Sequence, residues 1–153
     1  MKYLAVCAQQ SAEHQVLTFA ARAADVLRFA SIERIGRNEH GELSGFQRPQ
    51  VAAHIREIRD YLEKPNAVLP NPIVVAFTDR VAIDELGNGA AQLTIDVSAG
   101  TPGLVVDGQQ RLSALTQVDR DFQIFVSALI CRDDAELRRQ FVLINNTRPL
   151  PKS

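Results

Sequence analysis

The sequence predicts one mixed α/β domain, with helices packed on a mixed β-sheet, over its 153 residues. A continuous apolar run at residues 73–77 is typical of a central strand buried on both faces. Residues 93–97 alternate between apolar and polar, as in a half-exposed strand. Between residues 51 and 62, apolar side chains recur at the helical period. A hydrophobic content of 46% suits a single compact domain with a substantial core.

The first third of the chain predicts two strands and a helix. Residues 3–8 are apolar and indicate a strand, with residues 15–19 as its antiparallel partner, although this second stretch also has helical character. The better helix runs from residue 20 to residue 29. Residues 32–35 form a short extended segment.

The middle of the chain predicts the longest helix and two further strands. Pro49 suits the first turn of that helix, where its missing donor is harmless, and residues 64–66 end it. The sequence Leu-Gly-Asn-Gly at residues 86–89 indicates a turn. A second turn at residues 101–103 leads into the apolar strand at residues 104–106.

The last third predicts a helix, a strand and a second helix. Residues 112–118 present apolar side chains on one helix face, and residues 122–130 form a long strand. Asp133 or Asp134 can cap the final helix. The residues of this helix that we expect to face the core are Leu137, Phe141 and Ile144.

Charge and cysteine content exclude few classes of protein. The formal net charge of −1 gives no global positive field of the kind that marks many nucleic-acid-binding proteins. Cys7 and Cys131 lie far apart without metal-ligand spacing, which predicts two buried reduced thiols. Neither a signal peptide nor an apolar run long enough to cross a bilayer is evident, so we expect a soluble cytoplasmic protein.

A polar cluster made of Asp107, Gly108, Gln109, Gln110 and Arg111 follows the predicted strand at residues 104–106. The first backbone N–H groups of a helix are unpaired, and the helix dipole adds partial positive charge there. Gly108 permits an unusual backbone angle and the close approach of a ligand, and Arg111 can add a bidentate phosphate contact. The two glutamines offer donors and acceptors, and Asp107 can hold a divalent metal or an attacking water. The cluster therefore predicts a phosphate-binding pocket; the alternative is a helix cap with an incidental arginine.

Two further polar groups lie at predicted helix ends. Gln47 and Arg48 precede Pro49, and Arg48 can act as a second phosphate clamp or simply be a surface arginine. Asn145 and Asn146 end the final helix. They can line the same pocket, or they can form a C-cap in which an asparagine adopts left-handed geometry.

Several other mechanisms lack their sequence signatures. The chain has no P-loop motif, no Cys/His cluster for zinc and no Gly-x-Ser-x-Gly nucleophile elbow. It has no tryptophan, seven phenylalanines and two tyrosines, which disfavours a base-stacking platform.

The polar groups carry a resemblance to a known family. The segment VVDGQQRLSAL resembles the signature of DGQHR-domain proteins, with glutamine at the usual histidine position. GFQRPQVAAHIREIRDYL resembles the family's upstream Gln-Arg helix, and FVLINNTRPLPKS resembles its downstream segment. The three segments occur in the family's order and cover the chain from about Phe19 to Ser153. Because this family is similar to the ParB/sulfiredoxin fold, the resemblance implies a ParB/sulfiredoxin-like domain.

The superfamily resemblance bears on individual residues of the cluster. Gly108 and Arg111 match the glycine and arginine of the Gly-Cys-His-Arg motif of sulfiredoxin. Gln109 stands at its reactive cysteine, which excludes sulfinic-acid reduction. Gln109 also lacks the charge of the metal-holding glutamate of ParB-type proteins, so a metal role passes to Asp107. Gln110 replaces a titratable histidine and removes acid catalysis at that position.

The resemblance implies an ATP-binding and ATP-hydrolysing component, with Mg²⁺, of a DNA-modification or phage-defence system. Its DpdB-like members support insertion of 7-deazaguanine derivatives into DNA beside a transglycosylase-type partner, and DNA is contacted directly or through that partner. The implied catalytic residues are Asp107, Gln109 and Arg111, with Asp107 also the metal ligand. The implied nucleotide- and phosphate-binding residues are Gln47, Arg48, Gly108, Gln109, Gln110, Arg111, Asn145 and Asn146.

Two alternatives stay open. The first is a DndB-like DNA-binding transcriptional regulator of a DNA phosphorothioation system without catalysis. The second is a nuclease-type effector, as in related DGQQR-bearing restriction proteins. Because family members are commonly longer, we expect residues 1–153 to be the N-terminal part of a longer protein.

Overall fold

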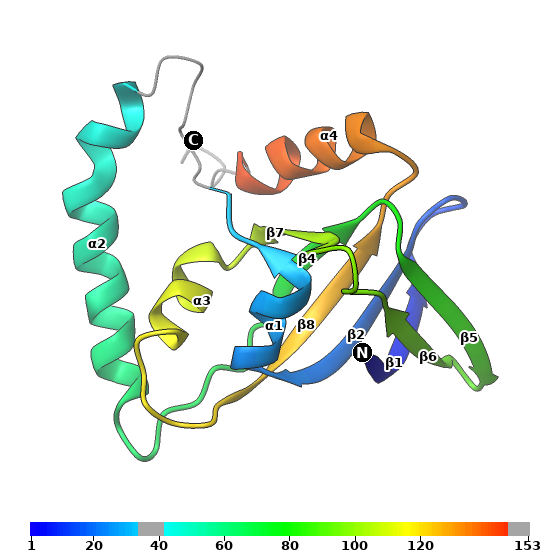
Figure 1. Cartoon of the computed structure of the whole chain (residues 1–153), viewed down its shortest axis with the longest axis horizontal. Coiled ribbons are helices and arrows are strands. Elements are labelled where there is room, and N and C mark those ends of the chain that lie inside the picture. Colours follow the sequence, from blue (N-terminus) through cyan, green and yellow to red (C-terminus); the bar gives the residue numbers. More distant parts are fainter. Residues whose placement is uncertain (34–41, 147–153) are drawn as a thin grey trace, which may run out of the picture.

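The computed structural model describes residues 1–33 and 42–146 of the chain, and the side chains of residues 1–33 and 51–146. Twelve elements follow one another in this part (Figure 1): β1 (Lys2–Gln9), β2 (Gln15–Arg22), α1 (Ala23–Phe29), β3 (Ala30–Ser31), α2 (Glu42–Leu62), β4 (Ile73–Phe77), β5 (Val81–Gly87), β6 (Ala90–Ile95), β7 (Gly103–Asp107), α3 (Gln109–Leu115), β8 (Gln123–Ile130) and α4 (Asp134–Asn145).

All the strands join one sheet in the order β3-β7-β4-β8-β2-β1-β6-β5. The β3–β7 and β4–β8 pairs are parallel, and the other neighbouring pairs are antiparallel. The predicted mixed α/β fold is therefore confirmed. Among the described helices, none is long and apolar enough to cross a membrane.

Alternating side chains of the central strands build two apolar clusters, one on each face of the sheet. Val75 and Phe77 of β4 belong to the larger cluster, which also takes side chains from α1, α3 and the end of α2. Ala76, between them, belongs to the smaller cluster under α4. Figure 1 accordingly shows α1 and α3 on one side of the sheet and α4 on the other. Leu137, Phe141 and Ile144 of α4 pack on this second cluster, which confirms the predicted core face of the final helix.

Several sequence predictions match the observed elements closely. The strand at residues 73–77 is confirmed as β4, which lies between β7 and β8. Asp133 is the N-cap of α4, and its carboxylate accepts a hydrogen bond from the Glu136 backbone N–H at 2.9 Å. The turn at residues 86–89 is confirmed, since Asn88 and Gly89 connect β5 to β6 and both have positive φ.

The predicted helix at residues 20–29 is wrong in its first turn. The strand β2 continues to Arg22, and only residues Ala23–Phe29 are helical. The β2–β8 ladder runs without interruption from Val16↔Leu129 to Arg22↔Gln123. Its backbone hydrogen bonds override the weak helical preference of the alanine-rich stretch.

The predicted start of the long helix is also wrong. The helix α2 begins at Glu42, so Pro49 lies inside it rather than in its first turn, at the cost of one backbone hydrogen bond. The apolar period at residues 51–62 indicated only part of α2. The short extended segment expected at residues 32–35 is replaced by β3, Ala30–Ser31; Ile32 and Glu33 have no regular structure, and residues 34 and 35 lie outside the described residues.

The strand β5 has no counterpart in the sequence predictions. It lies at one edge of the sheet, pairs only with β6 and is largely exposed. Only Val81 and Ile83 of this strand pack on the core, and two apolar residues are too short a pattern to indicate a half-buried strand. The predicted burial of the thiols holds for Cys131, whose pKa is raised to about 11 by that burial, whereas Cys7 is half-buried.

Candidate functional site

The predicted polar cluster lies at the junction of β7 and α3. Asp107 is the last residue of β7, and Gly108 turns the chain into α3 with φ 90° and ψ 20°. A β-bulge between Val74 and Val75 of β4 lies opposite, where Val74 pairs with Asp107. Bulges are frequent beside functional sites because they redirect side chains at a strand end. The glycine is required here, since positive φ of this size strongly favours glycine.

Arg111 has contacts that its sequence context did not indicate. Its Nη1 donates to the carbonyl of Asn71 at 2.7 Å, and its Nη2 donates to the carbonyl of Pro72 at 3.3 Å. Its Nη2 also lies 3.6 Å from Asp107 Oδ2, and the Arg111 side chain is 21% exposed. The guanidinium therefore fastens the segment before β4 to the junction. Two of its five N–H donors point to those carbonyls, and Nη2 also faces the Asp107 carboxylate.

The two glutamines of the cluster differ in their contacts. Gln109 Nε2 donates to the carbonyl of Val105 at 3.4 Å, whereas the Gln110 side chain makes no hydrogen bond to any other described residue. Both residues are partly exposed. The first turn of α3 has no side-chain cap and no acidic residue, and Leu112 N is the first amide to bond to the Gly108 carbonyl. The amides of the preceding three residues are thus left for a polar partner.

Asn145 joins the end of α4 to the strand that carries the cluster. Its Nδ2 donates to the carbonyl of Val106 at 2.8 Å and to the carbonyl of Phe141 at 2.7 Å. The fold thereby brings the Asn145 group next to the residue that precedes Asp107. Asn146 is the C-cap of α4, which confirms the capping alternative, but its φ of −101° and ψ of 8° show that the expected left-handed geometry is wrong.

The Gln47–Arg48 pair is located only by its backbone. Both residues lie within α2, which packs against α3, but their side chains lie outside the described part of the chain. The helix that carries Arg48 is thus a neighbour of the helix that carries Arg111. Of the other two polar groups, Asn145 is bonded to Val106, the residue before the Asp107–Arg111 cluster, and not to the cluster itself.

A metal at this junction would need ligands beyond the side chains that the structure describes. Within residues 1–33 and 51–146, no three His, Cys, Asp or Glu side chains gather in a way that could hold a metal ion. The Asp107 side chain is 51% exposed, and it belongs to no cluster of possible metal ligands among the described residues. Mg²⁺ is commonly held by one or two carboxylates together with substrate phosphates and water. The residues therefore fit a magnesium ion that arrives with a nucleotide, and do not fit a site made by protein ligands alone.

A family profile described as DndB, DNA-sulfur modification-associated, matches residues 4–153. The chain belongs to the DndB family. No curated protein and no solved structure matches it. Membership of the DndB family supports a component of a DNA-modification system, while the narrower DpdB-like assignment stays a prediction.

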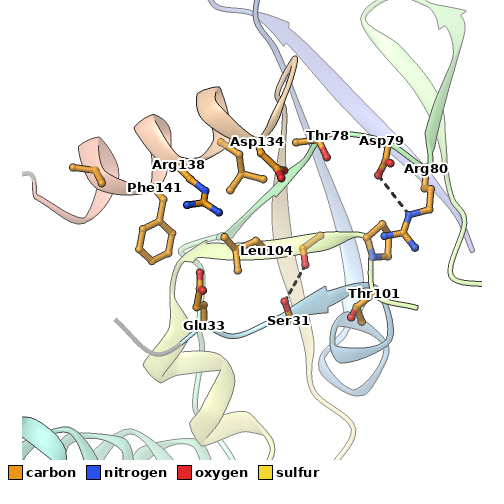
Figure 2. A pocket seen from close by; sticks show the side chains of 14 residues that line it. Ser31, Glu33, Thr78, Asp79, Arg80, Thr101, Leu104, Asp134, Arg138 and Phe141 are labelled. Atoms are coloured by element: carbon orange, nitrogen blue, oxygen red, sulfur yellow. Dashed lines mark hydrogen bonds and ion pairs between the residues drawn. The ribbon is translucent and has the colours of Figure 1, made fainter. Parts of the chain in front are cut away.

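This DndB-family chain has a cavity of about 670 Å³ that the sequence did not indicate. It lies between α4 and the strands β3, β4 and β7 (Figure 2). No local sequence motif predicts this cavity, because its walls come from segments far apart in the chain. Among the residues that line it are Ser31, Glu33, Thr78, Leu104, Arg138 and Phe141.

The DndB-family chain also contains a buried charged contact between the β1–β2 hairpin and α4. His14 Nε2 contacts Glu136 Oε1, and His14 Nδ1 lies 2.7 Å from Ser11 Oγ. Glu136 is 5% exposed, and its carboxylate also accepts a hydrogen bond from the Arg132 backbone N–H at 3.0 Å. These contacts lower the pKa of Glu136, with the Arg132 N–H as the larger cause. The group fixes the hairpin to the start of α4 and was missed because His14 and Glu136 are 122 residues apart.

Proposed function

We propose that this chain is the nucleotide-binding, ATP-hydrolysing component of a DNA-sulfur modification system. The observation that carries the proposal is the Asn145–Val106 hydrogen bond of 2.8 Å. It brings the polar end of α4 to the strand that leads into Asp107, so that a second polar group lies at the same end of β7. Asp107, Gln110 and the amides that follow Gly108 are then near one another and open to a ligand.

Each residue of the junction has a role that its contacts allow. The amides after Gly108 and the uncommitted Gln110 side chain bind phosphate oxygens. Asp107 orients water and holds Mg²⁺ together with the phosphates, where the bound ion would supply charge neutralisation. Phosphoryl transfer depends mainly on positioning and charge stabilisation, which these groups can provide.

Three other residues complete the proposed site. Arg111 contributes its remaining donors while its contacts with Asn71 and Pro72 hold it in place. Gln109 and Asn145 act as positioning residues, because their amides are bonded to backbone carbonyls. Arg48 and Gln47 on α2 and Asn146 at the end of α4 remain candidate ligand contacts.

The family match supports the biological setting of the proposal. Its description is DNA-sulfur modification, so this modification replaces 7-deazaguanine insertion as the setting that we favour. Support of 7-deazaguanine insertion beside a transglycosylase-type partner stays a narrower prediction. In either setting, nucleotide turnover would gate a partner that acts on DNA.

The test is ATP binding and phosphate release by the protein, with and without magnesium. Asp107→Asn and Gln110→Ala are the informative variants, because neither removes the carbonyl contacts of Arg111. Gln117→Ala, on the exposed segment after α3, is the matched control. We expect both site variants to lower ATP affinity or turnover at least tenfold and the control to match the unaltered protein. Unchanged binding and turnover in both site variants would remove the junction as the nucleotide site.

A second candidate is a DNA-binding regulator without catalysis. The engagement of Arg111 by two backbone carbonyls favours it, since an arginine so occupied is a weaker clamp for a transferring phosphoryl group. This candidate predicts DNA affinity that falls steeply with salt and persists without nucleotide. Absence of ATP binding together with salt-sensitive DNA binding would select it.

A further inference from the structure

The cavity beneath α4 carries chemistry that the nucleotide-binding proposal does not use. Its volume of about 670 Å³ falls within the 300–1,000 Å³ range usual for small-molecule sites. It is open beside α4, and it lies against the first residues of β7, at the opposite end of that strand from Asp107. It is therefore a different site from the β7–α3 junction.

Three side chains of different chemistry converge on this cavity. Phe141 and Arg138 project from the same side of α4, one turn apart, and Glu33 projects toward them from beyond β7 (Figure 2). The Phe141 ring is only partly buried, so one part of it faces the cavity rather than the core. An aromatic ring beside a carboxylate and a guanidinium is a combination that binds flat, polar, ring-shaped ligands.

Two charged groups of the cavity, Glu33 and Arg138, are uncommitted. Within the described residues, neither Glu33 nor Arg138 forms a hydrogen bond or an ion pair, although ion pairs are found for many other charged side chains. The other charged groups of the wall are Asp79, Arg80 and Asp134, and Arg80 is paired with Asp79 at 3.5 Å. A carboxylate and a guanidinium left without partners on one cavity are available to a ligand that offers both donors and acceptors.

We propose that this cavity binds an unpaired guanine base. Guanine presents two adjacent donors, N1–H and the N2 amino group, which suit one carboxylate. It also presents two adjacent acceptors, O6 and N7, which suit one guanidinium bidentately. Glu33 and Arg138 supply these two partners, and Phe141 stacks on the base. The donors lie on the Watson–Crick edge, so the base must be unpaired to be read in this way.

The remaining walls suit the rest of a nucleotide. The hydroxyl groups of Ser31, Thr78 and Thr101 line the cavity on the side away from Phe141 and can bond to sugar or phosphate oxygens. Adenine offers no pair of adjacent donors, and cytosine offers no pair of acceptors in a purine-like arrangement. The side-chain set therefore selects guanine over the other bases.

Binding measurements with defined probes test the inference. Single-stranded oligothymidylates of twelve nucleotides that carry one central dG, dA or dC are titrated into the protein by fluorescence anisotropy. Guanosine 5′-monophosphate is titrated separately by calorimetry. A bidentate base contact discriminates on the order of 5- to 150-fold, so we expect the dG oligonucleotide to bind at least about tenfold tighter than the others.

Variants connect the preference to the cavity. Glu33→Gln retains size but can no longer accept from both donors, so we expect the preference for dG to fall to threefold or less. Arg138→Met is expected to weaken guanine binding about tenfold, while Arg139→Met, its exposed neighbour outside the cavity, is the control and leaves binding unchanged. Circular dichroism checks that each variant is folded. The side chains of Glu33, Arg138 and Arg139 are all exposed, so we expect the three variants to fold.

The possible outcomes distinguish a free guanine nucleotide from a base of single-stranded DNA. They also distinguish binding in the cavity from binding at the β7–α3 junction. Tight binding of the free monophosphate indicates a guanine nucleotide as ligand, and binding of the oligonucleotide alone indicates a base of single-stranded DNA; both support the inference. Guanine binding that Asp107→Asn abolishes but Glu33→Gln leaves intact would assign it to the β7–α3 junction and overturn the inference. Equal binding of all bases, or no binding of any probe, would also overturn it.

Discussion

Replacing Gly108 with alanine tests the conformation of the junction on which the nucleotide proposal depends. Gly108 has φ 90°, where an L side chain costs about 1–2 kcal/mol. The added Cβ would also lie 3.0 Å from Ile73 Cγ1 and 3.0 Å from Arg111 Nη2. The end of Arg111 can move, but Ile73 is fully buried, and crowding of a packed core costs about 1–3 kcal/mol. We expect Gly108→Ala to lower the free energy of unfolding by about 2–5 kcal/mol.

Gly87 provides a matched control for backbone strain. Its φ is 89°, and nothing lies within 4 Å of a Cβ added there. Gly87→Ala therefore carries the strain without the crowding. Both substitutions restrict the unfolded chain equally, so this contribution cancels in the comparison. We expect Gly87→Ala to cost about 1–2 kcal/mol and Gly108→Ala to cost at least about 1 kcal/mol more.

Urea unfolding followed by far-UV circular dichroism measures both losses. The slope of the free energy against urea should stay equal in the two variants, which licenses a direct comparison of midpoints. If Gly108→Ala were no more destabilised than Gly87→Ala, Gly108 would not be pinned between Ile73 and Arg111. The described geometry of the junction would then be refuted.

Two further predictions concern the ends of α4. The lowered pKa of Glu136 stabilises the fold above its ordinary pKa of 4.5, and this contribution disappears as the pH falls through the lower folded-state value. Urea midpoints measured from pH 7 to pH 3 should therefore fall less steeply for Glu136→Gln than for the unaltered protein. An unchanged pH dependence would contradict the contacts of Glu136 with His14 and the Arg132 backbone. Asn145→Ala leaves the Val106 carbonyl of β7 without its donor and should lower the free energy of unfolding by about 1–3 kcal/mol. Asn146 is exposed and has no described side-chain contact, so Asn146→Ala should cost less than about 0.5 kcal/mol. Equal losses of stability in thermal unfolding would contradict the hydrogen bond from Asn145 to β7.

The sequence predicted those elements whose burial leaves a periodic pattern. The strand at residues 73–77 and the packed part of α2 were recognised because their apolar residues follow the periods of a buried strand and a helix. The end of β2 at Arg22 was not recognised, because pairing with β8 decides it and the local sequence does not. The edge strand β5 was missed because only Val81 and Ile83 give it an apolar face, and its other residues are exposed.

The features of the candidate site that depend on local sequence were predictable, and those that depend on distant segments were not. The turn at Gly108 was predictable, because the sequence Asp-Gly after an apolar strand has a local meaning. The contacts of Arg111 with Asn71 and Pro72 were not predictable, since these carbonyls lie 40 and 39 positions away in the chain. The cavity beneath α4 has the same origin, because its wall combines Glu33 with the segment after β4 and with residues of β7 and α4.

The most direct test of the account is an amide chemical-shift titration of the isotope-labelled protein with ATP and magnesium. If the β7–α3 junction binds the phosphates, the amide signals of Gly108, Gln109 and Gln110 should shift most and saturate together. The Gln117 amide, outside the junction, should stay in place. Saturation of the protein with ATP while those three amides remain unmoved would contradict the central claim.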